Sequence, residues 1–585
     1  MKSSGRILSV PLAVLSCLGA IVQVSSSRGT LTLDEAAAAG EEPRPLPAGL
    51  RILYETPMQS FRLDRDLFMG LWRQWPAGAE RTQAAEFATS TSNEEARAAL
   101  YSLLLRHYGL HLDPRRGNDV PAAFATPPVG DGEPEGEWTM NCLVCHGGSM
   151  AGRFQPGLPN HTLMLEALVT DVVAAKMAGR SGLDDGMAMA QLGHTIGTTE
   201  ATLFGEVLLR FREPNMDLRD LPGLVRAGSR NVARLSSLPE GLLALDAPAW
   251  WQLRHKTHMY LDHSVEKNHR TVMQFTLGLD DMAFKPGVRE IVVGGTEAEV
   301  RKVLGRIAAK EVLDIREIYA EESGEIDAPE EFLLHVTQSM PRMPLLAQLA
   351  LSRHIEPAGI HGETIRGWDD EFQEIFRFID STQPPPYPGE IDAVLAEEGR
   401  ALYDRTCARC HGHHDGSGPA YVSRRVDLDV IGTDPLYPTA LDQTFRDSLV
   451  GFLTERSDGT QVDIATDAEA DEGYVAPPLN GVWASAPYLH NGSVPTVEHL
   501  LDHERRIELE ESGQHAWIVE DPEAYDHEGL GLRARFLSGE EREQRSRDHR
   551  VRDSKRRGMS AEGHDFGAVL DASERRAVIE YLKTL

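Results

Sequence analysis

Four of the five cysteines in this chain fall into two copies of one motif, Cys-x-x-Cys-His. The residues of the two copies are Cys142, Cys145 and His146, and Cys407, Cys410 and His411. Two cysteines at this spacing lie on one helical turn, so both sulfurs can form thioether bonds to the vinyl groups at one edge of a haem. The adjacent histidine then binds the iron as the proximal ligand. The spacing therefore predicts two covalently bound c-type haems.

Other uses of these cysteines fit the sequence less well. A redox-active Cys-x-x-Cys pair belongs in a thioredoxin-like βαβ setting, which neither copy shows. A structural zinc site needs about four ligands, so the two pairs would have to meet across the long stretch between them. Exported proteins normally use cysteines for disulfides, yet every cysteine after Cys17 belongs to a motif. We therefore expect no structural disulfide in the mature chain.

The N-terminal residues have the pattern of a signal peptide. Lys2 and Arg6 give a positive start, and an apolar stretch interrupted by Pro11 follows. We expect residues 1–26 to be removed and the mature chain to be periplasmic or secreted, where c-type haem is attached. A membrane anchor is the weaker alternative, because the apolar stretch is short for a span. Acylation at Cys17 is a further alternative, since the residues before it loosely resemble a lipoprotein cleavage site.

Length, composition and charge set broad limits on the class of protein. At 585 residues the chain is too long for one compact core, so two or more domains are expected. Hydrophobic residues make up 41% and charged residues 25%, as in soluble globular proteins, and we expect no membrane span after processing. The formal net charge of -31 argues against a nucleic-acid partner, because phosphate binding needs basic patches.

A proline-rich stretch marks the expected domain boundary. Residues 381–389 contain four prolines and a glycine, which end a helix and make a stiff linker. We place the linker at residues 384–390, between an N-terminal haem domain at 45–383 and a C-terminal cytochrome c domain at 391–585. Charges crowd and few apolar residues recur at about 504–563, which predicts a surface insertion.

Helical periodicity dominates, so the predicted fold class is mainly α, with two haem domains, long loops and little β. In the C-terminal part a helical run ends at Cys407 and carries Gly399 and Tyr403 on one face. The last helix begins near Asp571, with Glu574 placed for a capping box. This pair is similar to the first and last helices of a cytochrome c domain, where a glycine allows close approach. Helical steps in the N-terminal part occur at 94–108, 163–177 and 297–312.

The chemistry at each iron depends on the ligand opposite the motif histidine. A methionine there gives a high-potential electron carrier, whereas an open position allows O₂ or peroxide chemistry. After His411 the chain has a single methionine, Met559, in a charged stretch, which argues against methionine at the second haem. The histidines that could bind there are His490, His499, His503, His515, His527, His549 and His564. We favour His490, because its segment is aromatic, bounded by prolines and nearly uncharged, as expected of a loop that covers a haem.

The first haem leaves more alternatives open. Its candidate sixth ligands include Met150, His161, Met164 and His194, and an open site is equally allowed. Residues 248–274 contain four histidines, whose charged neighbours indicate a solvated helix face rather than a metal cluster. These histidines are His255, His258, His263 and His269. Trp250 and Trp251, in the same stretch, are candidates for the pocket of the first haem, and an ordinary aromatic core pair is the alternative.

Several segments resemble the rubber-oxygenase-like dihaem cytochromes, within the bacterial dihaem cytochrome c peroxidase superfamily. The matching segments lie at residues 138–160, 248–251, 486–493, 563–564 and 581–583. Matches run from about residue 60 to the end, so the resemblance covers most of the mature chain. The Pro-Tyr-Leu-His-Asn-Gly pattern that contains His490 is specific to the superfamily but not to one activity.

The resemblance implies a division of labour between the two haems. The histidine that matches His490 is the distal ligand of the C-terminal haem, which would then be six-coordinate and transfer electrons. The N-terminal haem would be the reactive one and bind O₂ or peroxide opposite His146. Trp250 and Trp251 match a position near that reactive pocket. Membership of such a family does not fix the substrate.

Three functions remain open on the sequence alone. The first is an oxidoreductase that activates O₂ or peroxide at the N-terminal haem, with a redox partner protein or a small-molecule substrate. The second is a non-catalytic electron-transfer dihaem cytochrome, and the third is a haem-based sensor, which would need a signalling domain. The large N-terminal part favours the enzyme, because extra fold often builds a pocket. Peroxidase and oxygenase types are not distinguished by these residues.

Overall fold

The computed structural model describes the chain in separate stretches. These are residues 45–58, 62–90, 93–126, 136–165, 167–168, 171–172, 175, 195–199, 244–261, 265–269, 272, 369–414, 419–440, 473–546, 548–556 and 558–585. The predicted signal peptide, the predicted helix at 297–312, His194 and His263 lie outside the described residues.

By its internal packing the chain divides into two units. The first unit comprises Met1–Leu46 and Asp113–Asp119. Within its described residues, η2 (Pro114–Arg116) is a 3-10 turn that begins at Asp113, whose carboxylate accepts a hydrogen bond from the backbone of Arg115. The second unit comprises Pro47–Leu112 and Val120–Leu585, and it contains all the other described elements.

The N-terminal half of the second unit has short helices around a small antiparallel sheet. Its helices are α3 (Ala48–Glu55), α4 (Arg65–Gly70), η1 (Leu71–Gln74), α5 (Ala79–Thr89), α6 (Glu94–Tyr108), α7 (Leu143–His146) and α11 (Trp250–Leu253). The three-stranded sheet has the order β1 (Arg62–Asp64), β3 (Glu137–Met140), β2 (Phe124–Ala125). Three two-stranded pairs are β4 (Gly147–Met150) with β5 (Arg153–Pro156), β6 (Thr198–Thr199) with β7 (Leu245–Asp246), and β8 (His258–Met259) with β9 (Val265–Glu266).

Helix α6 confirms the helix predicted at 94–108. Asn93 caps its start by accepting a hydrogen bond from the backbone of Glu95, and Gly109 ends it with a φ of 65°, which favours glycine. Its buried leucines pack in one core cluster with Phe68 and Trp138. This cluster also contains Val144 of the first motif, so the helix supports the turn that carries the first pair of cysteines.

The C-terminal half contains more helices and further small sheets. Its helices are α19 (Asp369–Ser381), α20 (Ala393–Thr406), α21 (Ala408–His411), α22 (Leu428–Ile431), α23 (Leu436–Ala440), η6 (Val482–Ala484), α25 (Val497–Leu501), α26 (His503–Glu511), α27 (Gly539–Gln544), η7 (Asp565–Val569) and α28 (Ala572–Leu582). Its strands are β10 (His413–His414), β11 (Pro419–Ala420), β12 (Arg425–Asp427), β13 (Gly473–Val475), β14 (Ala516–Val519), β15 (Tyr525–Asp526), β16 (Gly531–Leu532), β17 (Ala534–Phe536) and β18 (Arg552–Asp553). Of the described residues 45% are helical and 15% are in strands, so helix predominates as predicted.

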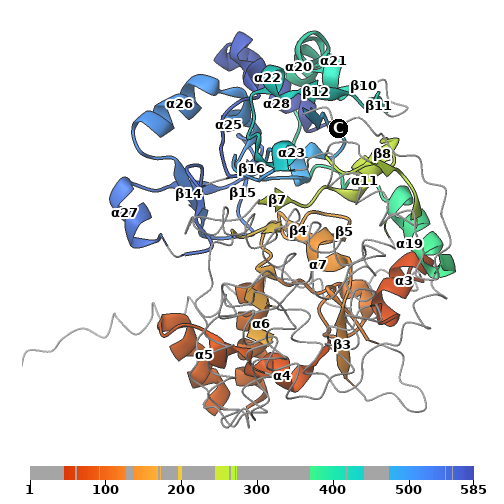
Figure 1. The fold of residues 1–585 in the computed structure, drawn as a ribbon, viewed down its shortest axis with the longest axis vertical. Coiled ribbons are helices and arrows are strands. Elements are labelled where there is room, and N and C mark those ends of the chain that lie inside the picture. Colours follow the sequence, from red (N-terminus) through yellow and green to blue (C-terminus); the bar gives the residue numbers. More distant parts are fainter. Residues whose placement is uncertain are drawn as a thin grey trace, which may run out of the picture. The chain divides into compact units, whose positions relative to one another are not determined.

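Helices α20 and α28 form the close pair that the sequence predicts (Figure 1). A Cβ on Gly399 would overlap the backbone carbonyl of Ala577, so glycine is what allows this approach. Beside the contact, the rings of Tyr403 and Tyr581 lie 5.1 Å apart. Asp571 begins α28 in a complete capping box with Glu574, as expected. The pair places the second motif directly after the end of α20.

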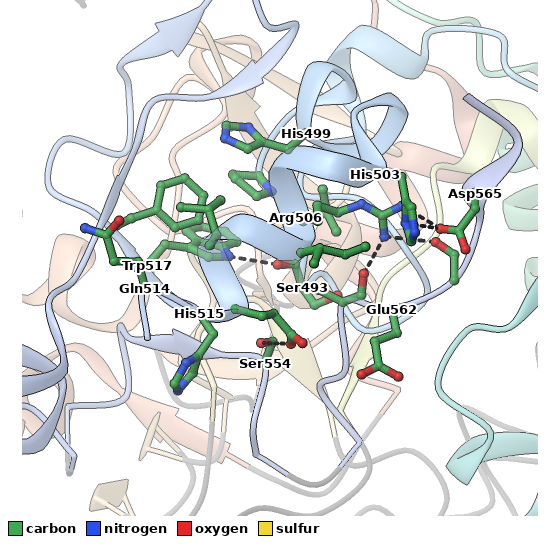
Figure 2. A pocket seen from close by; sticks show the side chains of 18 of the residues that line it. Ser493, His499, His503, Arg506, Gln514, His515, Trp517, Ser554, Glu562 and Asp565 are labelled. Atoms are coloured by element: carbon green, nitrogen blue, oxygen red, sulfur yellow. Dashed lines mark hydrogen bonds and ion pairs between the residues drawn. The ribbon is translucent and has the colours of Figure 1, made fainter. Parts of the chain in front are cut away.

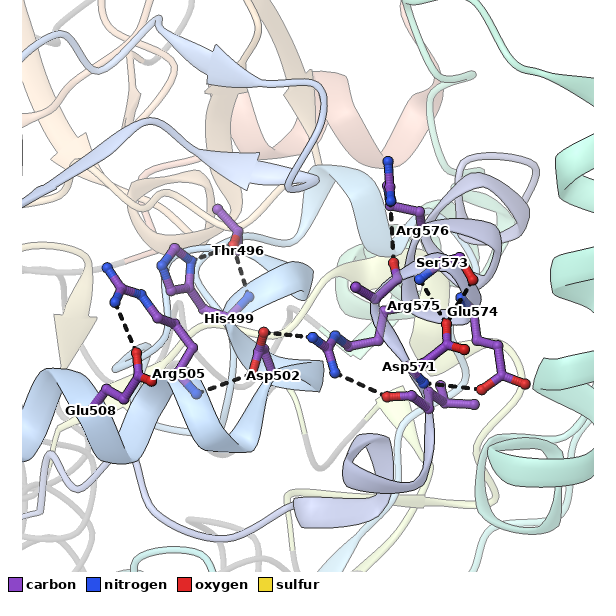
Figure 3. A network of polar contacts seen from close by, with 12 residues as sticks. Thr496, His499, Asp502, Arg505, Glu508, Asp571, Ser573, Glu574, Arg575 and Arg576 are labelled. Atoms are coloured by element: carbon purple, nitrogen blue, oxygen red, sulfur yellow. Dashed lines mark hydrogen bonds and ion pairs between the residues drawn. The ribbon is translucent and has the colours of Figure 1, made fainter.

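A polar network joins the last helix to the segment before it. Figure 3 shows Asp502 between two arginines of different helices. Its carboxylate accepts a hydrogen bond from the backbone of Arg505, at the start of α26, and one from the Arg575 side chain of α28 at 2.7 Å. One carboxylate therefore caps α26 and ties it to α28.

The segment 504–563 differs from the predicted surface insertion, because it contributes to the core. Its sheet has the order β17-β14-β18, and Trp517 and Arg552 on that sheet are each 2% exposed. The guanidinium of Arg552 donates to the carbonyl oxygens of Gly492 and His161. This stretch thus holds together parts of the chain that are far apart in sequence.

The proline-rich stretch after α19 is non-helical and packs against both flanking parts. The indole nitrogen of Trp483 donates to the carbonyl of Pro385 at 2.9 Å, and the Gln155 side chain donates to the carbonyl of Gln383 at 2.8 Å. Helix α19 itself packs against α3 and α11 (Figure 1). The division into two haem domains at this stretch stays a prediction.

Candidate haem sites

Both Cys-x-x-Cys-His motifs fold into the same helical turn. In each, the backbone N–H of the histidine donates to the carbonyl of the first cysteine, from His146 to Cys142 and from His411 to Cys407, both at 3.1 Å. The four cysteines of the two motifs are half-buried, and none of them forms a disulfide with another. Each pair of cysteines therefore lies on one helical turn, as thioether attachment to one edge of a haem requires.

The two motif histidines are held in the same way. The Nδ1 of His146 lies 3.0 Å from the carbonyl oxygen of Pro248, and the Nδ1 of His411 lies 2.7 Å from that of Pro477. A carbonyl accepts only from a protonated nitrogen, so Nε2 is left free to bind a metal. Burial lowers the pKa of His146 to about 4 and also lowers the pKa of His411, which keeps both rings in the neutral, metal-binding form.

The thiol environment agrees with haem better than with the other uses of cysteine. Burial, with the neighbouring Cys410, raises the pKa of Cys407 to about 12, whereas a redox-active cysteine has a lowered pKa. No cluster of three or more His, Cys, Asp or Glu residues that could hold a metal ion occurs within the described stretches. The two pairs of cysteines therefore do not meet in a zinc site.

The ring that faces His411 belongs to His564. Their ring centroids are 6.1 Å apart and their planes are inclined by 54°. Imidazole nitrogens bind metals at about 2 Å, so two rings on opposite sides of one metal have centroids about 6 Å apart. Burial and the nearby His411 lower the pKa of His564 to about 3, and its Nδ1 is buried with no hydrogen-bond partner. His564 also has a φ of 53°, and such strained positions cluster at functional sites.

His490, favoured by the sequence, has a different neighbour. Its ring stacks on Tyr474 with centroids 4.3 Å apart, and its Nε2 lies 2.9 Å from the hydroxyl of that tyrosine. Its backbone carbonyl accepts a hydrogen bond from Asp246. Among the described residues no ring contact joins His490 to His411. One feature of the sequence could have favoured His564 over His490. Gly563-His564 is among the segments that resemble the rubber-oxygenase-like dihaem cytochromes.

Trp250 and Trp251 lie on the side of His146 that is held by Pro248. The ring of Trp250 is 5.3 Å from the ring of His146, and its backbone N–H donates to Gly157. Trp251 is fully buried, and its indole nitrogen donates to the carbonyl of Asn480 at 2.7 Å. Trp250 thus packs beside the histidine of the first motif, and the assignment of both indoles to the pocket of the first haem stays a prediction.

The candidate sixth ligands of the first haem, among the described residues, lie in different parts of the structure. Met150 and Met164 belong to two separate core clusters. His161 is 3% exposed, and neither of its ring nitrogens forms a hydrogen bond of good geometry, although a contact with the backbone of Pro522 acts to raise its pKa. Burial, followed by the charge of Arg552, lowers the pKa of His161 to about 3. Of these residues, His161 has the side chain with unused metal-binding capacity.

The stretch that begins at Pro248 is not the solvated helix face that the sequence indicates. Its first helix, α11, is four residues long and mostly buried. His255, His258 and His269 are partly exposed and do not form a metal cluster within the described residues. Lys256, by contrast, is only 8% exposed.

A cavity of about 350 Å³ lies next to the residue that precedes His564. Its wall includes Trp517 and Gly563, and Figure 2 shows His503 and Arg506 meeting Asp565 at one side. His503 and Arg506 approach that carboxylate at 2.6 and 3.1 Å. The cysteines and histidine of the second motif do not line this cavity, so it is separate from the space between His411 and His564.

Two family matches fall on the second site. The family described as RoxA-like, cytochrome c-like matches residues 473–509, and the family described as cytochrome c oxidase, cbb3-type, subunit III matches residues 394–451. The C-terminal part is a c-type cytochrome region. Such a region implies covalently bound haem c and electron transfer, and the match at residues 394–451 includes the second motif. Cytochrome c domains are typically exported, and no described helix is long and apolar enough to cross a membrane.

Two of the curated relatives are uncharacterised proteins of Sinorhizobium fredii strain NBRC 101917 / NGR234. The protein y4iM is 31% identical over 249 residues, which cover 36% of this chain and 53% of the relative. The protein y4iJ is 27% identical over 262 residues, which cover 35% of this chain and 41% of the relative. The chain spans about half the length of the curated relatives it matches.

Proposed function

We propose that this chain is an exported dihaem c-type cytochrome that acts as a haem-dependent oxidoreductase. The observation that supports two haems is that the two motifs have the same local structure. Each is a single helical turn, and each has its histidine Nδ1 bonded to a proline carbonyl, that of Pro248 or Pro477. A chance Cys-x-x-Cys-His sequence would have no reason to repeat this support.

At the C-terminal haem we assign the sixth ligand to His564 in preference to His490. The spacing of 6.1 Å between the rings of His411 and His564 supports this choice, as does the unused Nδ1 of His564. His490 already has a partner in Tyr474. An iron with two histidine ligands has no open position, so this haem would transfer electrons and bind no substrate.

At the N-terminal haem we assign the reactive position. The ring in contact with His146 is Trp250, on the proximal side, and no second histidine ring faces His146 in the described part of the chain. A haem there would supply an iron able to bind O₂ or peroxide. The chain's own groups would hold His146 neutral, fix its Nε2 through Pro248, and exclude water on the proximal side with Trp250 and Trp251. The electrons would come from a redox partner protein or a small-molecule substrate.

A short path of backbone and one hydrogen bond joins the two carbonyls that hold His146 and His411, those of Pro248 and Pro477. The backbone leads from Pro248 to Trp251, three residues further on. The indole of Trp251 donates to the carbonyl of Asn480, and Asn480 follows Pro477 by three residues. The route therefore runs from one histidine-holding carbonyl to the other with one hydrogen bond on the way. It supports electron exchange between the two haems.

A second candidate function is a non-catalytic electron-transfer dihaem cytochrome. It is favoured by His161, a buried histidine whose ring nitrogens form no hydrogen bond of good geometry. If His161 bound the first iron, both haems would be six-coordinate and no position would be open to O₂ or peroxide.

The number of haems is tested by removing each pair of cysteines in turn. The wild-type holoprotein is expected to contain two haems by pyridine haemochrome assay against protein concentration. The variants Cys142→Ala/Cys145→Ala and Cys407→Ala/Cys410→Ala are each expected to keep one, so each serves as the control for the other. A wild-type haem content in the first variant would overturn the dihaem assignment.

A further inference from the structure

Tyr108 lies at the centre of a buried chain of hydrogen bonds in the N-terminal half. Its hydroxyl donates to Oδ2 of Asp171 at 2.8 Å and accepts from the indole nitrogen of Trp75 at 2.9 Å. The three residues are at most 2% exposed. Burial, followed by the charge of Asp171, raises the pKa of Tyr108 well above its usual value, so the hydroxyl keeps its proton at neutral pH. The phenol therefore holds a proton for which a base lies within hydrogen-bond distance.

The residue after Tyr108 is hydrogen-bonded through one side chain to the first motif. The amide of Asn160 donates to the carbonyl of Gly109 at 2.8 Å and to that of Val144 at 3.1 Å. The backbone N–H of Asn160 donates to the carbonyl of Cys145 at 2.9 Å. Val144 belongs to the same core cluster as Tyr108, and Cys145 packs against it. The peptide next to Tyr108 is therefore two hydrogen bonds away from the turn that would carry the first haem.

The other end of the chain of hydrogen bonds leads toward solvent. The indole of Trp75 stacks on the ring of His107, with centroids 3.8 Å apart and planes inclined by 21°. The side chain of His107 is 19% exposed, and its Nδ1 lies 3.3 Å from the carboxylate of Glu80. Tyr108 and Trp75 thus lie between the first motif and a partly exposed imidazole.

We propose that Tyr108 is a redox-active tyrosine that gives one electron to the N-terminal haem after a peroxide has oxidised that haem. This inference rests on the proposed reactive role of the N-terminal haem. In the step, the O–H bond of Tyr108 breaks, the proton binds to the carboxylate of Asp171, and the electron passes to the haem. The peroxide is the oxidant, and it takes up two electrons and two protons as it is reduced to water.

The carboxylate makes this oxidation possible in a buried site. Loss of the electron alone would leave a buried positive charge on the phenol, which is costly. With the proton on Asp171, the products are a neutral tyrosyl radical and a neutral carboxylic acid. The redox partner protein or small-molecule reductant of the proposed function then returns the electron, and Asp171 returns the proton. A network with only a structural role would never hold an unpaired electron on Tyr108, and this difference can be measured.

The experiment mixes each holoprotein with hydrogen peroxide, freezes it and records the electron paramagnetic resonance spectrum. The wild type is expected to give a tyrosyl signal, which is lost in Tyr108→Phe. Asp171→Asn keeps the shape of the side chain but removes the base, so it should lower the yield of the radical. Tyr101→Phe is the matched control and should keep the signal, because Tyr101 is buried in the same core cluster but lies outside the chain of Trp75, Tyr108 and Asp171.

Three results would overturn the inference and leave the proposed function intact. They are a signal that persists in Tyr108→Phe, an unchanged yield in Asp171→Asn, and no signal from a wild type whose haem absorbance responds to peroxide. A haem absorbance that peroxide leaves unchanged would contradict the reactive haem, and the proposed function would fail together with the inference.

A second variant keeps the test decisive if Tyr108→Phe yields no folded holoprotein. Trp75→Phe removes the hydrogen bond that the indole donates to the oxygen of Tyr108. The gx value of a tyrosyl radical rises when its oxygen loses a hydrogen bond, so high-field spectra of this variant should show a higher gx than the wild type. An unchanged gx would place the radical on another tyrosine and overturn the inference.

Discussion

The ring of His564 faces the ring of His411 with 6.1 Å between their centroids, the separation expected of two histidines on one iron. His564→Ala is therefore expected to convert the C-terminal haem from low spin to high spin, because its iron loses one strong ligand. Electron paramagnetic resonance of the oxidised holoprotein measures this change. His490→Ala is the control, expected to leave the spin state unchanged while it removes the contact with Tyr474. The reverse pattern would restore His490 as the ligand.

Gly399→Ala is expected to destabilise the C-terminal cytochrome region. The added Cβ would overlap the Ala577 carbonyl, and overpacking of this kind costs about 1–3 kcal/mol or more. Chemical denaturation followed by circular dichroism measures the loss. Gly539→Ala, at the start of α27 with open space around its Cα, is the control and should change stability by less than about 1 kcal/mol. Equal effects of the two substitutions would contradict the close approach of α20 and α28.

Trp251→Phe is expected to slow electron exchange between the haems. The substitution removes the hydrogen bond to the partly buried carbonyl of Asn480, at a cost of about 1 kcal/mol in stability. Trp483→Phe removes a comparable bond to Pro385, outside the route between the two supports. Flash photolysis of the half-reduced protein measures the exchange rate. A similar rate in both variants would show that Trp251 has only a structural role.

Asp246 gives the protein a pH dependence of stability. Burial raises the pKa of its carboxyl to about 7, against the charge of Arg552, and its Oδ1 has no hydrogen-bond partner. Between the usual aspartate range and pH 7 the folded state therefore holds a proton that the unfolded state has lost. The free energy of unfolding should fall as the pH rises through this window. Asp246→Asn should flatten that slope in thermal denaturation from pH 5 to 8, and an unchanged slope would contradict the raised pKa.

The parts of the fold that follow local rules could be predicted from the sequence. Helix α6 has the predicted bounds because a capping asparagine and a left-handed glycine mark both ends. The pairing of α20 with α28 followed from Gly399 and from the capping box at Asp571. The motif turns followed from the spacing of the cysteines. For the helix ends and the motif turns the signal lies within a few residues of the feature, whereas the pairing of the two distant helices was expected from their similarity to those of a cytochrome c domain.

The features that depend on contacts between distant segments could not be predicted. Seven histidines follow the second motif within reach, and which of them faces His411 depends on how the 504–563 segment folds. Because that segment is highly charged, the sequence predicted a surface insertion and not the buried residues that it contains. The apolar run of β14 around Trp517 was nevertheless a signal for a buried strand.

The most direct test of the division of labour is the number of CO molecules bound per fully reduced holoprotein, with total haem counted on the same sample. A ferrous iron binds CO when it has an open position, and an iron held by His411 and His564 has none. The proposed function predicts one CO for two haems, bound at the haem of His146. No CO for two haems would contradict the reactive N-terminal haem, and the electron-transfer cytochrome with His161 as a ligand would take its place.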